Sequence, residues 1–145
     1  MKELNFIVTI NCLTTEQTKR IYEKCSGTIS YINSNIEYDM INHDIIIYVP
    51  VASNLMPAII YNKNPDPPYN ISKDIGIEIN IEYVGAGDAA ILHKIADIIR
   101  MQFQPNDDNY KCEDIIINSY DDFNSLTVYI NNRLGIEPVL VFLPL

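Results

Sequence analysis

The stretch IGIEINIEYVGAGDAAILHKIADIIRMQF, residues 75–103, decides the fold that this sequence predicts. In its first part apolar residues alternate with polar ones, among them Glu78, Asn80 and Glu82. Successive side chains of a strand point to opposite faces, so the alternation predicts a strand with one face on a core and the other near solvent. From Asp88 onward the apolar spacing is that of a helix, which predicts an amphipathic helix to the end of the stretch with Asp88 as its cap.

Upstream of this stretch the pattern predicts mainly short strands. In order, we expect a strand at 4–12, a helix from Thr14 to Gly27, strands at 28–32, 36–41 and 44–49, and an apolar helix or strand at 55–61. Thr14 and Gln17 have the spacing of a helix cap, and Asn42-His43 has the chemistry of a hairpin turn. The segment Asn62–Asn70 contains three prolines and predicts an extended surface loop.

Downstream, a polar loop leads into a short strand at 115–118. The spacing from Phe123 to Leu134 predicts a helix, but Leu126–Ile130 also fits a strand, because valine, threonine, tyrosine and isoleucine favour strands. The tail from Ile136 predicts a last strand, and its proline places that strand at a sheet edge.

These elements predict one α+β domain over residues 1–145, with about three helices and a mostly antiparallel or mixed sheet of five or six strands. We find no internal repeat in the sequence. The competing interpretations of residues 55–61 and 126–130 stay open.

Composition narrows the classes of function. A net charge of −9 argues against binding nucleic acid or an anionic membrane, and no apolar run approaches the roughly 20 residues of a membrane span. Cys12, Cys25 and Cys112 are odd in number and lack C-x-x-C spacing, which argues against a disulfide framework or zinc site. We therefore expect a protein of the reducing cytoplasm, and its acidic charge suits a basic protein partner.

One motif could carry chemistry. Gly85-x-Gly87-x-x-Ala90 lies between a strand and a helix and matches the dinucleotide fingerprint, so a small nucleotide-binding or nucleotide-processing enzyme is the alternative function. The polar second face of the strand and the capping Asp88 argue against it, because a fingerprint strand is apolar throughout and a phosphate needs the amides that Asp88 would occupy. His93 with Asp97 is typical of a solvated helix face. We therefore expect no enzyme, no cofactor and no metal site.

The same central segment carries a family resemblance. An aspartate at the turn (Asp88), an Ile91-Leu92 pair, a closing aromatic (Phe103) and then a strand and an acidic helix start follow one another between Ile77 and Asp122. This order resembles the core of small bacterial immunity proteins, the neutralising partners encoded beside polymorphic or contact-dependent toxins.

The resemblance implies a cytoplasmic protein that binds a cognate toxin, and such toxins are often basic and cleave nucleic acid. It makes the acidic loop and helix start the expected contact surface. The residues of this expected contact surface are Asp107, Asp108, Tyr110, Glu113, Asp121 and Asp122. The polar strand face of Glu78, Asn80 and Glu82 is a second candidate surface.

Overall fold

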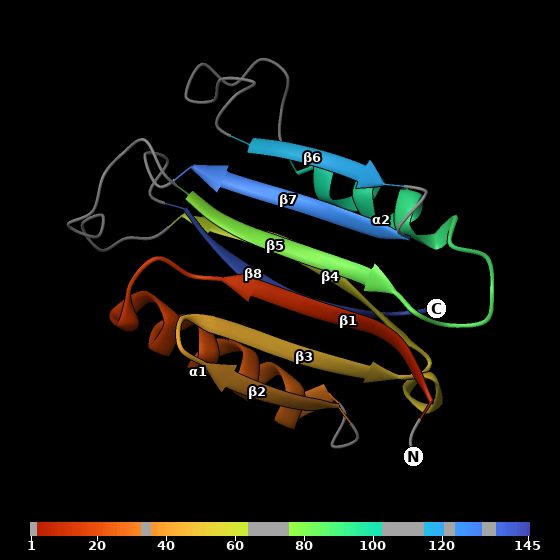
Figure 1. The fold of residues 1–145 in the computed structure, drawn as a ribbon, viewed down its shortest axis with the longest axis horizontal. Helices are drawn as coiled ribbons and strands as arrows, with labels where there is room; N and C mark the ends of the chain where they lie inside the picture. Colours follow the sequence, from red (N-terminus) through yellow and green to blue (C-terminus); the bar gives the residue numbers. More distant parts are fainter. Residues whose placement is uncertain (1–2, 33–35, 64–75, 103–114, 121–123, 132–135) are drawn as a thin grey trace.

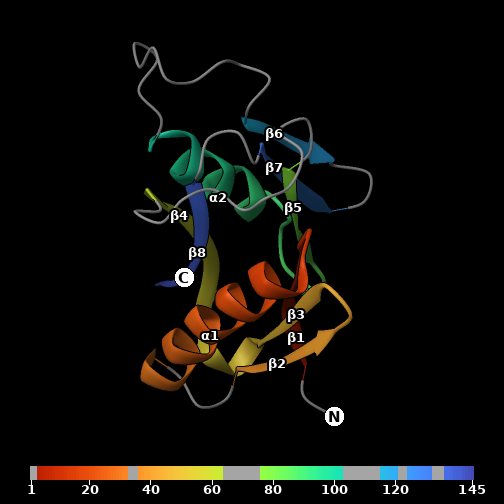
Figure 2. The same cartoon turned by 90° about the vertical axis from the view of Figure 1, so that its left-hand side faces the viewer.

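Two β-sheets and two α-helices form two layers in the computed structural model (Figures 1 and 2). The structure describes residues 3–32, 36–63, 76–102, 115–120, 124–131 and 136–145. The elements are β1 (Leu4–Asn11), α1 (Thr15–Ile32), β2 (Glu37–Ile41), β3 (Asp44–Pro50), the 3-10 turn η1 (Val51–Ser53), β4 (Leu55–Lys63), β5 (Gly76–Tyr83), α2 (Ile91–Arg100), β6 (Ile115–Tyr120), β7 (Ser125–Asn131) and β8 (Ile136–Pro144).

The first layer is a six-stranded antiparallel sheet with the strand order β2-β3-β1-β5-β7-β6 (Figure 1). The expectation of a mostly antiparallel or mixed sheet of five or six strands is thereby confirmed, although the sequence did not predict a separate two-stranded sheet. On its central strands the alternate residues that we expected to face inward are buried, including Val8 of β1 and Ile79 of β5. The predicted strand over 75–83 lies at the middle of this sheet, paired with β1 and β7.

The second layer covers one face of that sheet. It consists of a two-stranded antiparallel ribbon, β4 with β8, with α1 packed against β8 and α2 packed against β4 (Figure 2). The apolar segment 55–61 is therefore part of a strand, and the last strand does lie at an edge, as expected for its proline. Most of the hydrophobic core lies between the two layers.

Helix α1 is longer than the sequence predicted. The cap is confirmed, because the Gln17 amide donates to the Thr14 hydroxyl at 3.1 Å and the Leu13 amide donates to the Gln17 side chain at 2.8 Å. The stop at Gly27 and the strand at 28–32 are wrong, since the helix continues to Ile32. The physical reason is that its buried stripe continues past the glycine to Ile29.

The helix predicted from Phe123 to Leu134 is also wrong, and the strand alternative for this segment is correct. Leu126, Val128 and Ile130 alternate with half-buried residues and are buried on the inner face of β7. Pairing with β5 on one side and β6 on the other satisfies the backbone of this strand. Two α-helices, rather than about three, therefore occur among the described residues.

An internal structural repeat, which the sequence did not suggest, organises both layers. Residues 4–63 run β-α-β-β-β, and residues 76–144 run β-α-β-β-β again. Because β1 pairs with β5 and β4 pairs with β8, the two halves are related by an approximate twofold axis that passes between these strand pairs. The axis exchanges β2 with β6, β3 with β7 and β1 with β5, so the strand order is equivalent when it is counted from either edge of the sheet.

The strand registers agree with the repeat. Ile7 lies opposite Tyr48 in the first half, and Glu78 lies opposite Tyr129 in the second. Within the ribbon, Pro57 of β4 faces Phe142, and Pro138 of β8 faces Tyr61. The segments PAIIY (57–61) and PVLVF (138–142) thus occupy equivalent places and share a proline, two aliphatic residues and an aromatic.

Candidate functional site

The six-stranded sheet has a second face, which we call the outer face, and no described helix or strand covers it (Figure 1). Cross-strand registers align its side chains in rows; Tyr48, Ile7 and Glu82, for example, are successive neighbours. From β2 to β6 the outer-face residues are Glu37, Asp39, Ile41, Asp44, Ile46, Tyr48, Ile7, Thr9, Asn11, Glu78, Asn80, Glu82, Ser125, Thr127, Tyr129, Ile116 and Asn118. With strands about 4.8 Å apart, the face is about 24 Å wide.

Charge is segregated between the two layers. The six strands contain no lysine, arginine or histidine, whereas their outer face carries five carboxylates, from β2, β3 and β5. The basic residues of α1 and α2, such as Lys19 and Lys94, belong to the other layer. Like charges gathered on one face create a negative potential there, so the outer face attracts cations.

The acidic residues do not follow the internal repeat. Glu37 and Asp39 of β2 correspond by register to Ile116 and Asn118 of β6. The face therefore has an acidic part over β2, β3 and β5 and a neutral part over β7 and β6. In the neutral part Ile116 is 40% exposed, so it offers apolar contact beside the acids.

Polar contacts order the middle of the outer face. The Asn80 side-chain amide donates to the Thr127 hydroxyl at 3.2 Å across β5 and β7. Tyr48 and Tyr129 are half-buried on either side of this centre. Tyrosine combines a large apolar ring with a hydroxyl, which suits it to protein interfaces.

Of the two contact surfaces expected from the sequence, only the polar strand face lies among the described residues. Glu78, Asn80 and Glu82 lie together on the outer face, and both glutamates are exposed. The residues expected in the acidic loop and helix start lie outside the described residues, and their role stays a prediction. They are Asp107, Asp108, Tyr110, Glu113, Asp121 and Asp122. The sequence did not indicate that Glu37, Asp39 and Asp44 would join Glu78 and Glu82, because strand order brings them together.

Two amides of the Gly85 turn that a phosphate would use are already hydrogen-bonded to side chains. The Gly87 amide donates to the Tyr83 hydroxyl at 2.9 Å, and the Ala90 amide donates to Asp88 Oδ1 at 2.9 Å. The expected Asp88 cap of the helix is therefore wrong, because α2 begins at Ile91 and its cap position, Ala90, has no side-chain cap hydrogen bond; Asp88 instead holds the turn before the helix. These contacts favour a structural turn over a nucleotide cradle, since phosphate binding uses such amides.

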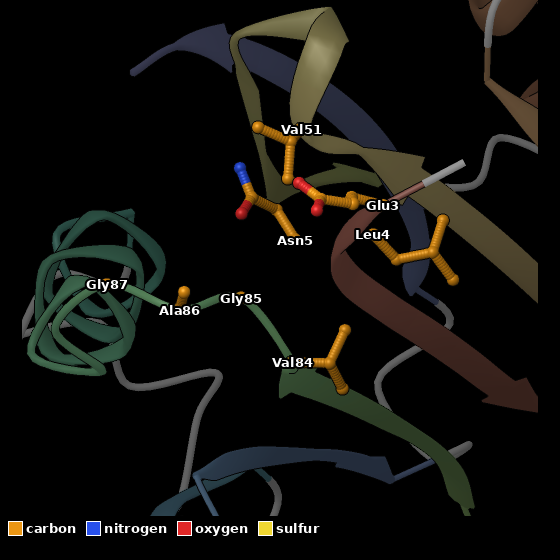
Figure 3. Close-up of a pocket in the computed structure, with 8 residues that line it drawn as sticks. All are labelled: Glu3, Leu4, Asn5, Val51, Val84, Gly85, Ala86 and Gly87. Carbon is orange, nitrogen blue, oxygen red and sulfur yellow. The ribbon is translucent and has the colours of Figure 1, made fainter. Parts of the chain in front are cut away.

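A pocket of about 440 Å³ lies beside this turn, where β1 begins and β5 ends (Figure 3). It is lined by Glu3, Leu4, Asn5, Val51, Val84, Gly85, Ala86 and Gly87. A Cβ on Gly85 would meet the Asn5 side-chain oxygen and the Tyr83 ring at less than 3 Å, so these side chains would have to shift to admit a larger residue.

The two described cysteines, Cys12 and Cys25, are packed inside the protein. Burial raises the pKa of the Cys12 thiol to about 11 and that of the Cys25 thiol to about 12, so both stay protonated at neutral pH. His43 lies in the β2–β3 turn, exposed, with its Nε2 atom 3.1 Å from the Thr15 hydroxyl.

Neither α1 nor α2, among the parts of the chain that the structure describes, is long and apolar enough to span a membrane. No protein-family model, curated protein sequence or solved structure matches this chain.

Proposed function

We propose that this chain is an immunity-type binding protein, which binds a cognate bacterial toxin in the cytoplasm and neutralises it without catalysing a reaction. The observation that supports the proposal is the outer face, a broad surface with five carboxylates and no basic residue on its six strands. A basic toxin surface that normally contacts phosphates would meet these carboxylates in their place. The opposed potentials would accelerate encounter and fix orientation.

The outer face also has the features from which interfaces gain affinity. Half-buried Tyr48 and Tyr129 supply rings that lose little side-chain entropy on binding, and the neutral part supplies apolar contact at Ile116. In this arrangement the carboxylates steer the toxin, and the tyrosines and isoleucine hold it.

The first experiment uses the product of the neighbouring gene. If this product inhibits growth when expressed alone, co-expression of the present chain should restore growth, and isothermal titration calorimetry should show direct binding. The affinity should fall as salt rises from 50 to 500 mM, because charge attraction across the interface is screened. A neighbouring gene that encodes no toxin-like protein would count against the proposal.

The surface is tested by reversing charge. Glu78→Lys with Glu82→Lys places two cations on the outer face, and both positions are exposed, so the fold should be preserved. We expect toxin binding to weaken at least about tenfold, mainly through slower association. Glu23→Lys, combined with Glu16→Lys, makes the same change in net charge on exposed positions of α1 and is the matched control. Equal losses in both variants would refute the outer face as the contact surface.

The alternative, a nucleotide-binding enzyme, is tested by thermal shift with nucleotides at millimolar concentration. A ligand that binds only the native state raises the melting temperature. We expect no shift, because the amides of Gly87 and Ala90 are already hydrogen-bonded. A reproducible rise of several degrees with any nucleotide would favour the enzyme over the immunity protein.

A further inference from the structure

The pocket beside the Gly85 turn has walls that the backbone holds in place. The Val51 amide donates to the Glu3 carbonyl at 2.9 Å, and the Val84 amide donates to the Asn5 carbonyl at 2.8 Å. The start of β1 is thereby tied to η1 on one side and to the end of β5 on the other. The pocket exists because three chain segments meet there, and it does not depend on one mobile loop.

The lining combines apolar surface with a single carboxylate. Val51 and Val84 are 38% and 39% exposed, which is high for valine at a point where chain segments meet. Figure 3 shows the Glu3 carboxylate between Val51 and the Asn5 side chain. No lysine, arginine or histidine is among the lining residues.

This chemistry selects against an anion. A phosphate or carboxylate would face Glu3 with no lining cation, and the Val84 and Gly87 amides already donate to Asn5 and Tyr83. An alkyl chain that ends in a positive charge fits better, because its methylenes can cover the valines while its charged end meets the carboxylate.

We propose that this pocket binds the side chain of an arginine or lysine supplied by the partner protein. The methylenes lie against Val51 and Val84, and the cation pairs with Glu3. Glu82 is the last outer-face residue of β5, and the lining residue Val84 follows two residues later, so the pocket lies next to the acidic part of the outer face. The inference rests on the proposed function for the source of the side chain, but its chemistry can be tested without a toxin.

The test is a titration of the whole chain with N-acetyl-L-arginine amide, followed by ¹H–¹⁵N NMR spectra. We expect saturable shifts, at millimolar ligand, of the amides of Val51, Val84, Gly85 and Gly87. The matched ligand is the citrulline analogue, which has nearly the same shape and no charge, and it should produce much smaller shifts. Equal shifts with both ligands, or arginine shifts that map elsewhere, would overturn the proposal.

Two variants test the pocket itself. Glu3→Gln removes the charge at an exposed position and should weaken arginine binding roughly three- to fivefold, the range expected for a partly exposed ion pair. Glu23→Gln on α1 is the control for net charge and should leave binding unchanged. Gly85→Ala places a Cβ against Asn5 and should displace that wall, with loss of the shifts. Native-like binding by both Glu3→Gln and Gly85→Ala would refute the site.

The outcomes separate this inference from the proposed function. Arginine binding without any binding of the neighbouring gene product would retain the cation pocket and reject the immunity function. Toxin binding that is unchanged by Glu3→Gln would retain the immunity function and reject the pocket as a contact. Toxin binding that weakens in Glu3→Gln, but not in Glu23→Gln, would support both.

Discussion

Glu137 offers the sharpest test of how helix α1 is held to the β4–β8 ribbon within the second layer. Its side chain on β8 is 2% exposed, and its carboxylate accepts a hydrogen bond from Lys24 Nζ at 2.7 Å and pairs with Arg20 Nε at 3.2 Å. Both cations come from α1, so this cluster fixes the helix to the ribbon. Met56, at the equivalent place on β4, is also 2% exposed, so the other half has an apolar side chain there.

We predict that Glu137→Gln lowers the free energy of unfolding by about 2–4 kcal/mol. Removing one member of a buried ion pair costs about 3–5 kcal/mol when the charge left behind is also buried. Here Arg20 and Lys24 are 28% and 39% exposed, so they can regain part of their hydration, which lowers the expected cost. Glu137→Met copies Met56 but takes the same carboxylate partner from Arg20 and Lys24, so its cost should fall in the same range of about 2–4 kcal/mol.

The measurement is urea unfolding followed by far-UV circular dichroism, because the chain has no tryptophan to report by fluorescence. With a denaturant slope of about 2 kcal/mol/M, in the middle of the usual range, the Glu137→Gln midpoint should fall by roughly 1–2 M. Asp97→Asn is the control, since it breaks an exposed pair with Arg100 (3.3 Å) and should cost under about 1 kcal/mol. A Glu137→Gln loss no larger than that of Asp97→Asn would refute this reasoning.

Three further predictions test the fold. Gly76→Ala should destabilise the protein by about 1–3 kcal/mol, because its Cβ would meet the backbone of β7. Gly27→Ala, which has open space around it in α1, should stabilise the protein by about 0.5–1 kcal/mol. Thermal melts in which Gly27→Ala is the less stable variant would contradict this packing. The Val51 amide of η1 bonds to the Glu3 carbonyl, and the Leu145 amide bonds to the Asn54 carbonyl just after η1. A circular permutant cut within 64–75, with its original ends joined by a linker, should therefore keep the native circular dichroism spectrum, and an unfolded permutant would argue against this arrangement of the two ends. Burial raises the pKa of Cys12 and Cys25 above their ordinary 9.0, so the folded state keeps thiol protons that the unfolded chain loses. The contribution of these thiols to the free energy of unfolding should be constant below pH 9 and should fall toward pH 12. The fall should be less steep in Cys25→Ala, and an identical pH slope in that variant would contradict the raised pKa of Cys25.

Local patterns predicted much of the sheet because alternate residues of a strand point to opposite faces. The central strand, the first strand and the hairpin at Asn42 were correct, and the last was predicted because asparagine tolerates the left-handed conformation, seen here with φ at 54°. The errors came where local signals conflict with packing. Gly27 has the features of a residue that ends a helix, and the apolar spacing of Phe123–Leu134 fits both a helix and a strand. Only packing against the surrounding elements could therefore decide between these structures.

The stretch 75–103 determined, by itself, a half-polar strand, a capped turn and an amphipathic helix. It did so because each depends on side chains close together along the chain. Tertiary structure alone decided the twofold repeat, since that repeat preserves apolar spacing and strand order while sharing few identical residues. It also decided where negative charge gathers. The carboxylates of β2, β3 and β5 share one face only because β1 joins the β2–β3 hairpin to β5 in a single sheet.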